Sequence, residues 1–278
     1  MGLRIATNIA SQVVQKNLSN VSSESKSHLE KLSSGKRINK AADDAAGMAI
    51  AINLEAQTKS LRQASRNAND GVSLIQTAEG GLNETSNILV RMRELSVQAA
   101  ADTVGENERN LINKEYQQLV SEVDRIASST TFNGANLLTG DSGKGVMDFQ
   151  VGAFSGEENK IQFDSDASNS TASNIGIEGS TVESKEDAGD SIGSIDEAIN
   201  SISSQRATLG AIQSRLNSAS KNLQTQIVNQ DQARSSIQDV DIADSSAKLA
   251  SANVLKSAAV ATLAQANAIP NSALRLVG

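Results

Sequence analysis

The 278-residue sequence lacks several residue types on which functional sites commonly depend. It contains no cysteine, which excludes disulfides, thiolate catalysis and zinc sites built on sulfur. Its one histidine, His28, excludes a multi-histidine metal cluster. It has a single proline, Pro270, where average usage would give about 14. The aromatic residues, 2% of the chain, all lie between positions 116 and 163, so we expect long uninterrupted elements without a large aromatic core.

Charge is also unevenly distributed along the chain, whose net charge is −7. The Gly-, Ser- and Asp-rich segment 141–190 carries most of the negative excess, which predicts an exposed, solvated surface insert. Nucleic-acid binding is not expected, because no aromatic residue lies among the basic residues of the first forty positions. Membrane insertion is not expected either, since no run of 18 apolar residues occurs, and no signal peptide is visible.

Two sets of apolar residues with a spacing of seven are the strongest pattern that is present. Such spacing is typical of coiled-coil seams. A third helical segment, 112–126, lies between them. Because the sets flank the central segment, we expect a mainly α fold, a long antiparallel coiled-coil-like bundle formed by the N- and C-terminal segments. The sets are Leu54, Leu61, Ala68, Ile75, Leu82 and Leu89, and Ile195, Ile202, Leu209, Leu216, Leu223 and Ile237.

Between 146 and 163 the apolar period changes to two, which predicts a small β-hairpin in the middle of the chain. A lone hairpin is marginally stable in water, so we expect it to lie against the helices. Residues 164–190 are expected to form a loop or a few short strands. The apolar positions of the hairpin are Met147, Phe149, Val151, Ile161 and Phe163.

The two terminal segments carry a weaker seam of small, polar and scattered apolar residues. Such narrow stripes bury too little apolar area to offset the entropy of ordering, so we expect both termini to be disordered until they meet partners. The predicted assembly seam consists of Val14, Leu18, Val21, His28 and Leu32 at the N-terminal end and Leu255, Ile269 and Leu276 at the C-terminal end.

No catalytic, cofactor or metal site is predicted. The segment GDSGKG has Gly145 where a phosphate-binding loop needs Ser or Thr. Asp239, Asp241 and Asp244 lack the glycine and the bidentate Glu of a calcium loop, and are expected instead to favour the N-terminal dipole of the last helix.

One surface stripe suggests an interaction. Arg91, Leu95 and Gln98 are spaced i, i+4 and i+7, on a face of the first long helix away from Leu89. Periodicity alone leaves two readings about equally open. Leu95 is either a scattered exposed apolar residue, or part of a patch that contacts the next subunit or a receptor.

Stretches covering most of 1–140 and 191–278 resemble those of short bacterial flagellins. They are MGLRIATNIAS, LSSGKRINKAADDAAGMAIA, NANDGVSLIQTAEGGLNE, LVRMRELSVQAA, EVDRIASSTTFNGANLL, LGAIQSRLNSA and LAQANAIPNSALRLV.

The resemblance implies a structural subunit, not an enzyme, that polymerises into the bacterial flagellar filament and serves motility. It implies secretion as an unfolded chain by flagellar type III export, and hence an extracellular location. It further implies an inner helical domain, 1–42 and 239–278, that lines the filament channel. The outer domain, 43–238, would hold the hairpin at 146–163 and a variable surface segment at 141–190. The hairpin, Met147 to Phe163, would act as the supercoil switch.

The resemblance also implies partners and no cofactor. They are other copies of the chain in a helical homopolymer, the flagellar cap protein, the hook–filament junction protein, an export chaperone at the C-terminal helix and the host Toll-like receptor for flagellin. Matched by motif, the receptor contact falls on Arg91, Leu95 and Gln98, with Glu115 on the neighbouring helix.

Three other hypotheses remain. A chemoreceptor hairpin would share the heptads but should have membrane spans and a helical tip. A hook–filament junction protein would match less completely through 32–51 and 122–138. A flagellin carrying a metallopeptidase would need HExxH, which is absent.

Overall fold

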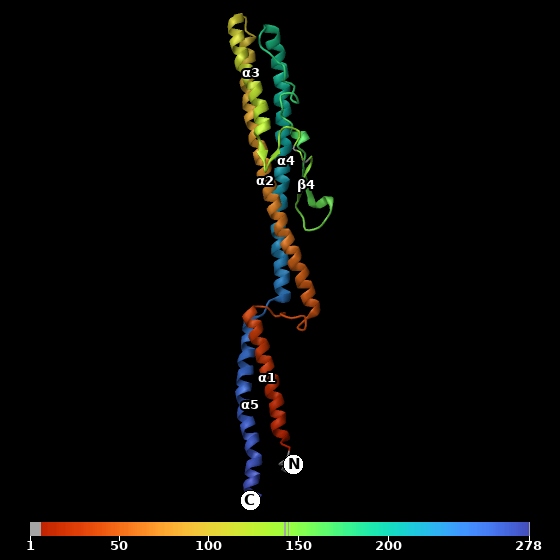
Figure 1. The fold of residues 1–278 in the computed structure, drawn as a ribbon, viewed down its shortest axis with the longest axis vertical. Coiled ribbons are helices and arrows are strands. Elements are labelled where there is room, and N and C mark those ends of the chain that lie inside the picture. Colours follow the sequence, from red (N-terminus) through yellow and green to blue (C-terminus); the bar gives the residue numbers. More distant parts are fainter. Residues whose placement is uncertain (1–6, 142, 144, 278) are drawn as a thin grey trace. The chain divides into compact units, whose positions relative to one another are not determined.

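A computed structural model describes residues 7–141, 143 and 145–277, with side chains described as far as residue 268. The described part is mainly helical, and its long helices are linked by short connections and one irregular region (Figure 1). The chain divides into two compact units, which we call unit 1 (up to residue 56, and from 229 onward) and unit 2 (57–228). The helices are α1 (Ile9–Ser34), α2 (Ala45–Ala99), α3 (Glu106–Ser129), α4 (Lys185–Gln238) and α5 (Ile242–Val277).

Each unit combines a segment from the first part of the chain with one from the last part. The chain therefore runs out and returns, as the paired heptads predict. Long packed helices with a small antiparallel hairpin confirm the predicted fold class.

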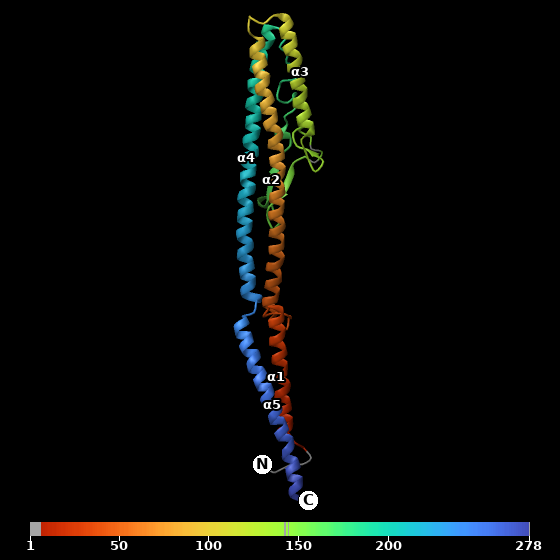
Figure 2. The same ribbon diagram turned by 90° about the vertical axis from the view of Figure 1, so that its left-hand side faces the viewer.

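Unit 1 contains α1 and α5, which lie side by side as an antiparallel pair (Figures 1 and 2). Helix α1 begins where the Asn8 side chain accepts a hydrogen bond from the Ser11 backbone N–H. It ends at Gly35, whose φ of 70° lies in the left-handed region that favours glycine. The expected disorder of these segments in the free chain stays a prediction.

The connections on either side of this helix pair are held together by backbone hydrogen bonds. Arg37 N–H donates to Gln238 O at 2.7 Å, and Val240 N–H donates to Gly35 O at 3.0 Å. The Arg37 side chain donates to Ile237 O, at the end of α4. Unit 1 also includes the first turns of α2 and the last turns of α4, so its limits differ from the expected domain limits at 42/43 and 238/239.

Unit 2 is built around the predicted heptad seam of α2 and α4. Leu61, Ala68, Ile75, Leu82 and Leu89 are at most 2% exposed. Their counterparts on α4, from Ile195 to Leu223, are at most 4% exposed. Helix α3 packs on the same core and adds Tyr116, Val123 and Ala127. The predicted packing of the two heptad segments is confirmed.

Two small antiparallel sheets lie in unit 2. Strand β3 (Met147–Gln150) pairs with β4 (Lys160–Phe163), with Met147 opposite Phe163 and Phe149 opposite Ile161, so the predicted hairpin is confirmed. A shorter pair, β1 (Thr131–Phe132) and β2 (Ala135–Asn136), is joined by a two-residue Asn-Gly turn. We did not predict this pair, although Asn-Gly is a strong hairpin signal.

The segment 164–182 corrects one expectation. It contains turns and a short 3-10 helix, but it is not a solvated insert. Ile175, Ile177 and Val182 are at most 5% exposed and belong to the unit 2 core. The expectation of a surface segment over 141–190 is wrong here, because the acidic side chains point to solvent while the apolar residues between them pack on the helices. Helix α4 also begins within this range, at Lys185.

Candidate assembly and recognition surfaces

The α1–α5 contact in unit 1 includes hydrogen bonds made by small polar side chains. Asn8 Nδ2 donates to Ala266 O at 2.8 Å, and Ser11 Oγ donates to Asn267 Oδ1 at 2.8 Å. Ser25 Oγ makes a similar bond of 3.3 Å to Asn253 Oδ1. Asn8 and Ser11 have short side chains. They can reach the backbone and the amide side chains of α5 only if the two helices lie close together. The contact therefore depends on small residues.

On α1 the predicted seam residues, Val14, Leu18, Val21, His28 and Leu32, are all half-buried. The His28 Nδ1 atom is buried and makes no hydrogen bond within the described residues. Because all five side chains are equally half-buried, they fit a single face of α1 that is directed at α5. Whether this face serves assembly stays a prediction.

On α5 the most buried side chains are small. Ser245, Ala252 and Ala266 are at most 5% exposed, and their spacing of seven or fourteen defines the face toward α1. Leu255 is 55% exposed and lies off that face. Its expected place in the assembly seam stays a prediction, since an exposed Leu255 is free to contact another subunit. The side chains of Ile269 and Leu276 lie outside the described residues.

A second surface lies on α2 and α3 in unit 2. The Arg91 guanidinium donates to Glu115 on α3 at 2.9 Å and to Glu94 at 3.0 Å. The hydrogen bond with Glu115 raises the pKa of Arg91. Arg91, Glu115 and Gln98 are exposed, so the motif places three polar groups on the surface.

The fourth residue of the motif, Leu95, is only 2% exposed and belongs to the unit 2 core. The expectation that it lies on an exposed face is wrong. Helix α2 packs against two helices rather than one, so its buried face is wider than the α2–α4 seam. On α2 beside the motif, Val90 is 48% exposed and Val97 is 51% exposed.

The hairpin forms the third surface. Phe163, Ile161 and Val151 are at most 9% exposed, whereas Met147 and Phe149 are half-buried. Gly71 of α2 makes room for the hairpin, since a Cβ there would lie 3.1 Å from Phe149 Cδ1. Asn67 Nδ2 donates to Gln150 O at 3.1 Å, which attaches β3 to α2.

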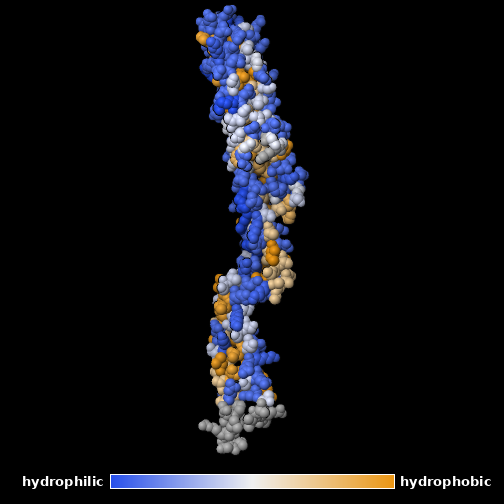
Figure 3. Space-filling view, viewed as in Figure 1, coloured by the Kyte–Doolittle hydropathy of each residue, from blue (hydrophilic) through white to orange (hydrophobic). Residues whose placement is uncertain are grey.

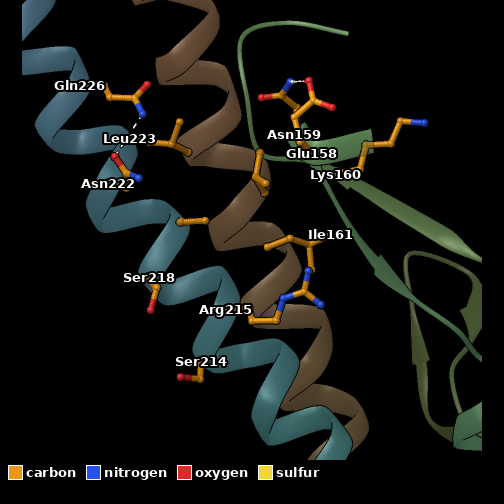
Figure 4. Close-up of a pocket in the computed structure, with 12 residues that line it drawn as sticks. Glu158, Asn159, Lys160, Ile161, Ser214, Arg215, Ser218, Asn222, Leu223 and Gln226 are labelled. Carbon is orange, nitrogen blue, oxygen red and sulfur yellow. Dashed lines mark hydrogen bonds between the residues drawn. The ribbon is translucent and has the colours of Figure 1, made fainter. Parts of the chain in front are cut away.

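The other side of the hairpin faces α4 across an open groove of about 490 Å³. Figure 4 shows Asn159, Lys160 and Ile161 on one side and α4 residues such as Arg215 and Asn222 on the other. The Lys160 ammonium forms ion pairs within the hairpin region, with the Glu157 carboxylate at 3.1 Å and the Asp148 carboxylate at 3.2 Å. Hydrogen bonds from Gln162 and Lys160 lower the pKa of Asp148. A second open groove, of about 390 Å³, separates part of the hairpin from α2, so open grooves border the hairpin on both the α2 and the α4 side.

Sequence reasoning missed several ion pairs between residues far apart in the sequence. Arg93 on α2 pairs with Asp196 on α4 at 2.7 Å, and Lys185 pairs with Asp102 at 2.7 Å. These partners are 103 and 83 residues apart, so no local spacing could have identified them. Among the described residues there is no group of three acidic or histidine side chains that could hold a metal ion, and no helix long and apolar enough to cross a membrane.

Comparison with known proteins decides the family. Residues 5–142 match the bacterial flagellin N-terminal helical region, and residues 192–277 match the bacterial flagellin C-terminal helical region. The chain belongs to the bacterial flagellin family. As a flagellin it is a structural filament subunit of the bacterial flagellum outside the cell, and not an enzyme. The chemoreceptor alternative is therefore wrong.

Individual relatives agree with this assignment. A flagellin of Halalkalibacterium halodurans is 44% identical over 90% of both chains. The flagellar filament core protein flaB2 of Brachyspira hyodysenteriae is 40% identical over 88% of this chain and 90% of its own. The flagellin of Bacillus cereus, known from a crystal structure, is 31% identical in sequence. The match covers 57% of the present chain and 88% of the Bacillus cereus chain, with a TM-score of 0.51.

Proposed function

We propose that this flagellin leaves the cell as an unfolded chain through the flagellar type III export channel and is ordered at the filament end with the cap protein. Two features support this. The sequence has no cysteine that could cross-link the chain during passage. The α1–α5 pair buries few side chains completely, since the apolar residues of α1 stay half-buried, so neither terminal helix gains much stability before assembly.

The terminal segments, 1–42 and 239–278, form the inner domain that lines the filament channel. The observation that carries this proposal is the apolar surface that α1 and α5 leave uncovered in a single chain, of which the part over α5 is seen as orange patches in Figure 3. Exposed apolar area of this kind marks a contact with other proteins. The residues concerned include Ile9, Val13 and Leu29 on α1, and Val254, Leu255 and Val260 on α5, all more than 50% exposed. Leu255 thus serves contacts between copies rather than the pairing of α1 with α5.

The outer domain, 43–238, carries the supercoil switch in the hairpin from Met147 to Phe163. Its partial attachment supports this role, because β3 is anchored on α2 at Gly71 and Asn67 while open grooves beside α4 and α2 leave room for movement. Arg91, Gln98 and Glu115 form the surface that the host Toll-like receptor for flagellin recognises. Leu95 supports this surface from beneath. Further partners are the hook–filament junction protein and an export chaperone that binds α5.

Deleting residues 255–278 tests the role of the terminal helices. The shortened chain should keep a helical, cooperatively folding unit 2, because the unit 2 core ends before residue 229. It should not polymerise when seeded with filament fragments, as checked by circular dichroism and electron microscopy. The full-length chain, seeded in parallel, is the control. Filaments built from the shortened chain would overturn this role for the terminal helices.

A further inference from the structure

Two adjacent glycines in the middle of α2, Gly80 and Gly81, have different surroundings. A Cβ on Gly81 would lie 2.6 Å from Thr130 Oγ1 and 2.7 Å from Leu138 Cδ1, so packing inside the chain accounts for this glycine. A Cβ on Gly80 would meet no atom within 4 Å. Glycine in a helix interior is destabilising relative to alanine. Nothing inside the chain explains glycine at position 80. The same holds for Gly189, Gly193 and Gly210 on α4. Gly80 differs from them in lining one groove together with Arg206.

Gly80 lies in a shallow groove of about 330 Å³ on the surface of unit 2. Gln76, Glu79 and Asn83 of α2 line it, together with Arg206 of α4. The Arg206 Nε atom is buried and has no hydrogen-bond partner within the described residues. The Arg206 Nη2 atom is 4.0 Å from Glu79 Oε1, so the pairing between these side chains is loose.

A buried N–H donor that lacks an acceptor is costly, and most such donors in proteins are satisfied. The Gly80 groove therefore has two unexplained features at one place: a donor without an acceptor, and a helix surface without a side chain. An approaching backbone carbonyl or carboxylate would account for both, because it would accept from Arg206 Nε and use the space that a Cβ would fill.

We propose that the Gly80 groove is a contact between subunits, in which a second copy of this chain packs over Gly80 and supplies the acceptor for Arg206 Nε. This inference rests on the filament role, since a homopolymer surrounds each subunit with copies of itself. Heterologous contacts of this kind, between two different patches of the same chain, are those that build open helical filaments.

Gly80→Ala tests the proposal because it should affect the free chain and the filament in opposite directions. In the free chain the substitution should raise Tm by about 2–4 °C, since alanine favours the helix and meets no neighbour. In the filament its methyl group should obstruct the second copy and raise the critical concentration about tenfold, the change that loss of one such contact would produce. A critical concentration equal to or below that of the unsubstituted chain would overturn the proposal.

Gly210→Ala on α4 is the matched control. Gly210 is also exposed, helical and without neighbours within 4 Å of an added Cβ. This variant should raise Tm to a similar extent and leave the critical concentration unchanged, which shows that added helix stability does not itself hinder polymerisation.

Arg206→Lys tests the acceptor directly, because lysine keeps the positive charge but removes the Nε–H group. The variant should raise the critical concentration without lowering Tm. Arg215→Lys is its control, since Arg215 is exposed and lies in a different groove. Equal critical concentrations for the two lysine variants would count against the proposed acceptor.

A chemical measurement complements these variants. Asn83→Cys introduces the single thiol of an otherwise cysteine-free chain, beside Gly80. A maleimide should label it readily in the free chain and about tenfold more slowly in filaments. Equal labelling rates would overturn the proposal. Failure of the unsubstituted chain to form filaments would instead contradict the filament role.

Discussion

The Arg91 guanidinium and the Glu115 carboxylate lie 2.9 Å apart and join the exposed sides of α2 and α3. Both side chains are about half exposed, so the pair is surrounded by solvent. Exposed ion pairs add little to stability, because their attraction is weak in water and ordering two long side chains costs entropy. The pair is therefore better suited to presenting charge to a partner than to stabilising the fold.

Arg91→Ala should accordingly leave Tm of the free chain nearly unchanged while lowering receptor signalling and weakening filaments. The measurements are thermal unfolding, a cell-based assay for the flagellin receptor and filament depolymerisation on heating. Arg125→Ala is a matched control, since Arg125 forms an exposed pair with Glu122 within α3. If Arg91→Ala and Arg125→Ala signal equally well and their filaments are equally stable, Arg91 has no special role at this surface.

Leu95→Ala should behave differently, because Leu95 is buried in the unit 2 core. Truncating a buried leucine leaves a cavity and should lower the free energy of unfolding by about 2–5 kcal/mol. Urea unfolding followed by circular dichroism measures the change. Val97→Ala, at a position 51% exposed, should change stability little. A stability loss at Leu95 no larger than at Val97 would contradict its place in the core.

The heptad pattern was sufficient to predict the α2–α4 seam, because Leu61 to Leu89 and Ile195 to Leu223 each follow one helix face without a break. It was not sufficient for Leu95. A spacing rule describes one buried stripe, whereas α3 covers a second side of α2, and α3 is held there by core packing of residues such as Tyr116 and Val123.

The segment 164–182 was misjudged for a related reason. Its polar composition suggested a solvated loop, but a few apolar residues, Ile175, Ile177 and Val182, are enough to hold it against the core. Their burial depends on partners far along the chain, such as Asp124, which accepts from Ala172 N–H, and Gln117, which donates to Ser180 O. Composition averages over these residues and cannot show which of them pack.

Gly71→Ala should displace the hairpin from α2. The added Cβ would lie 3.1 Å from Phe149 Cδ1 and 3.2 Å from Leu216 Cδ1, so either side chain must move. Crowding of this kind costs about 1–3 kcal/mol, against a helix-propensity gain of about 1 kcal/mol. We expect a small net loss of stability on urea unfolding and an altered supercoil by electron microscopy of filaments.

Gly210→Ala again provides the comparison, because it gives the same gain in helix propensity without a hairpin contact. An unchanged supercoil in Gly71→Ala filaments would indicate that contact between the hairpin and α2 does not set the switch.

Tyr116 is the one tyrosine of the chain, and its surroundings lead us to expect that the free energy of unfolding depends on pH in the alkaline range. Its side chain is fully buried on α3, and its hydroxyl lies 2.7 Å from Ser180 Oγ. Burial raises the pKa of Tyr116 above its ordinary value, because the phenolate would lose its hydration. The folded state thus holds this proton more tightly than the unfolded state. The contribution of this proton to stability is fully present below the unfolded-state pKa of about 10, and it is lost as pH rises through the folded-state pKa.

We therefore expect the free energy of unfolding to fall above about pH 10 in the unsubstituted chain. Tyr116→Phe removes this titration. It should lose about 1 kcal/mol at neutral pH, since one buried hydrogen bond is removed, and should show a shallower decline in alkali. Urea unfolding at a series of pH values compares the two chains, and phenolate absorbance gives the titration directly. Parallel alkaline declines in both chains would show that Tyr116 does not hold its proton more tightly in the folded state.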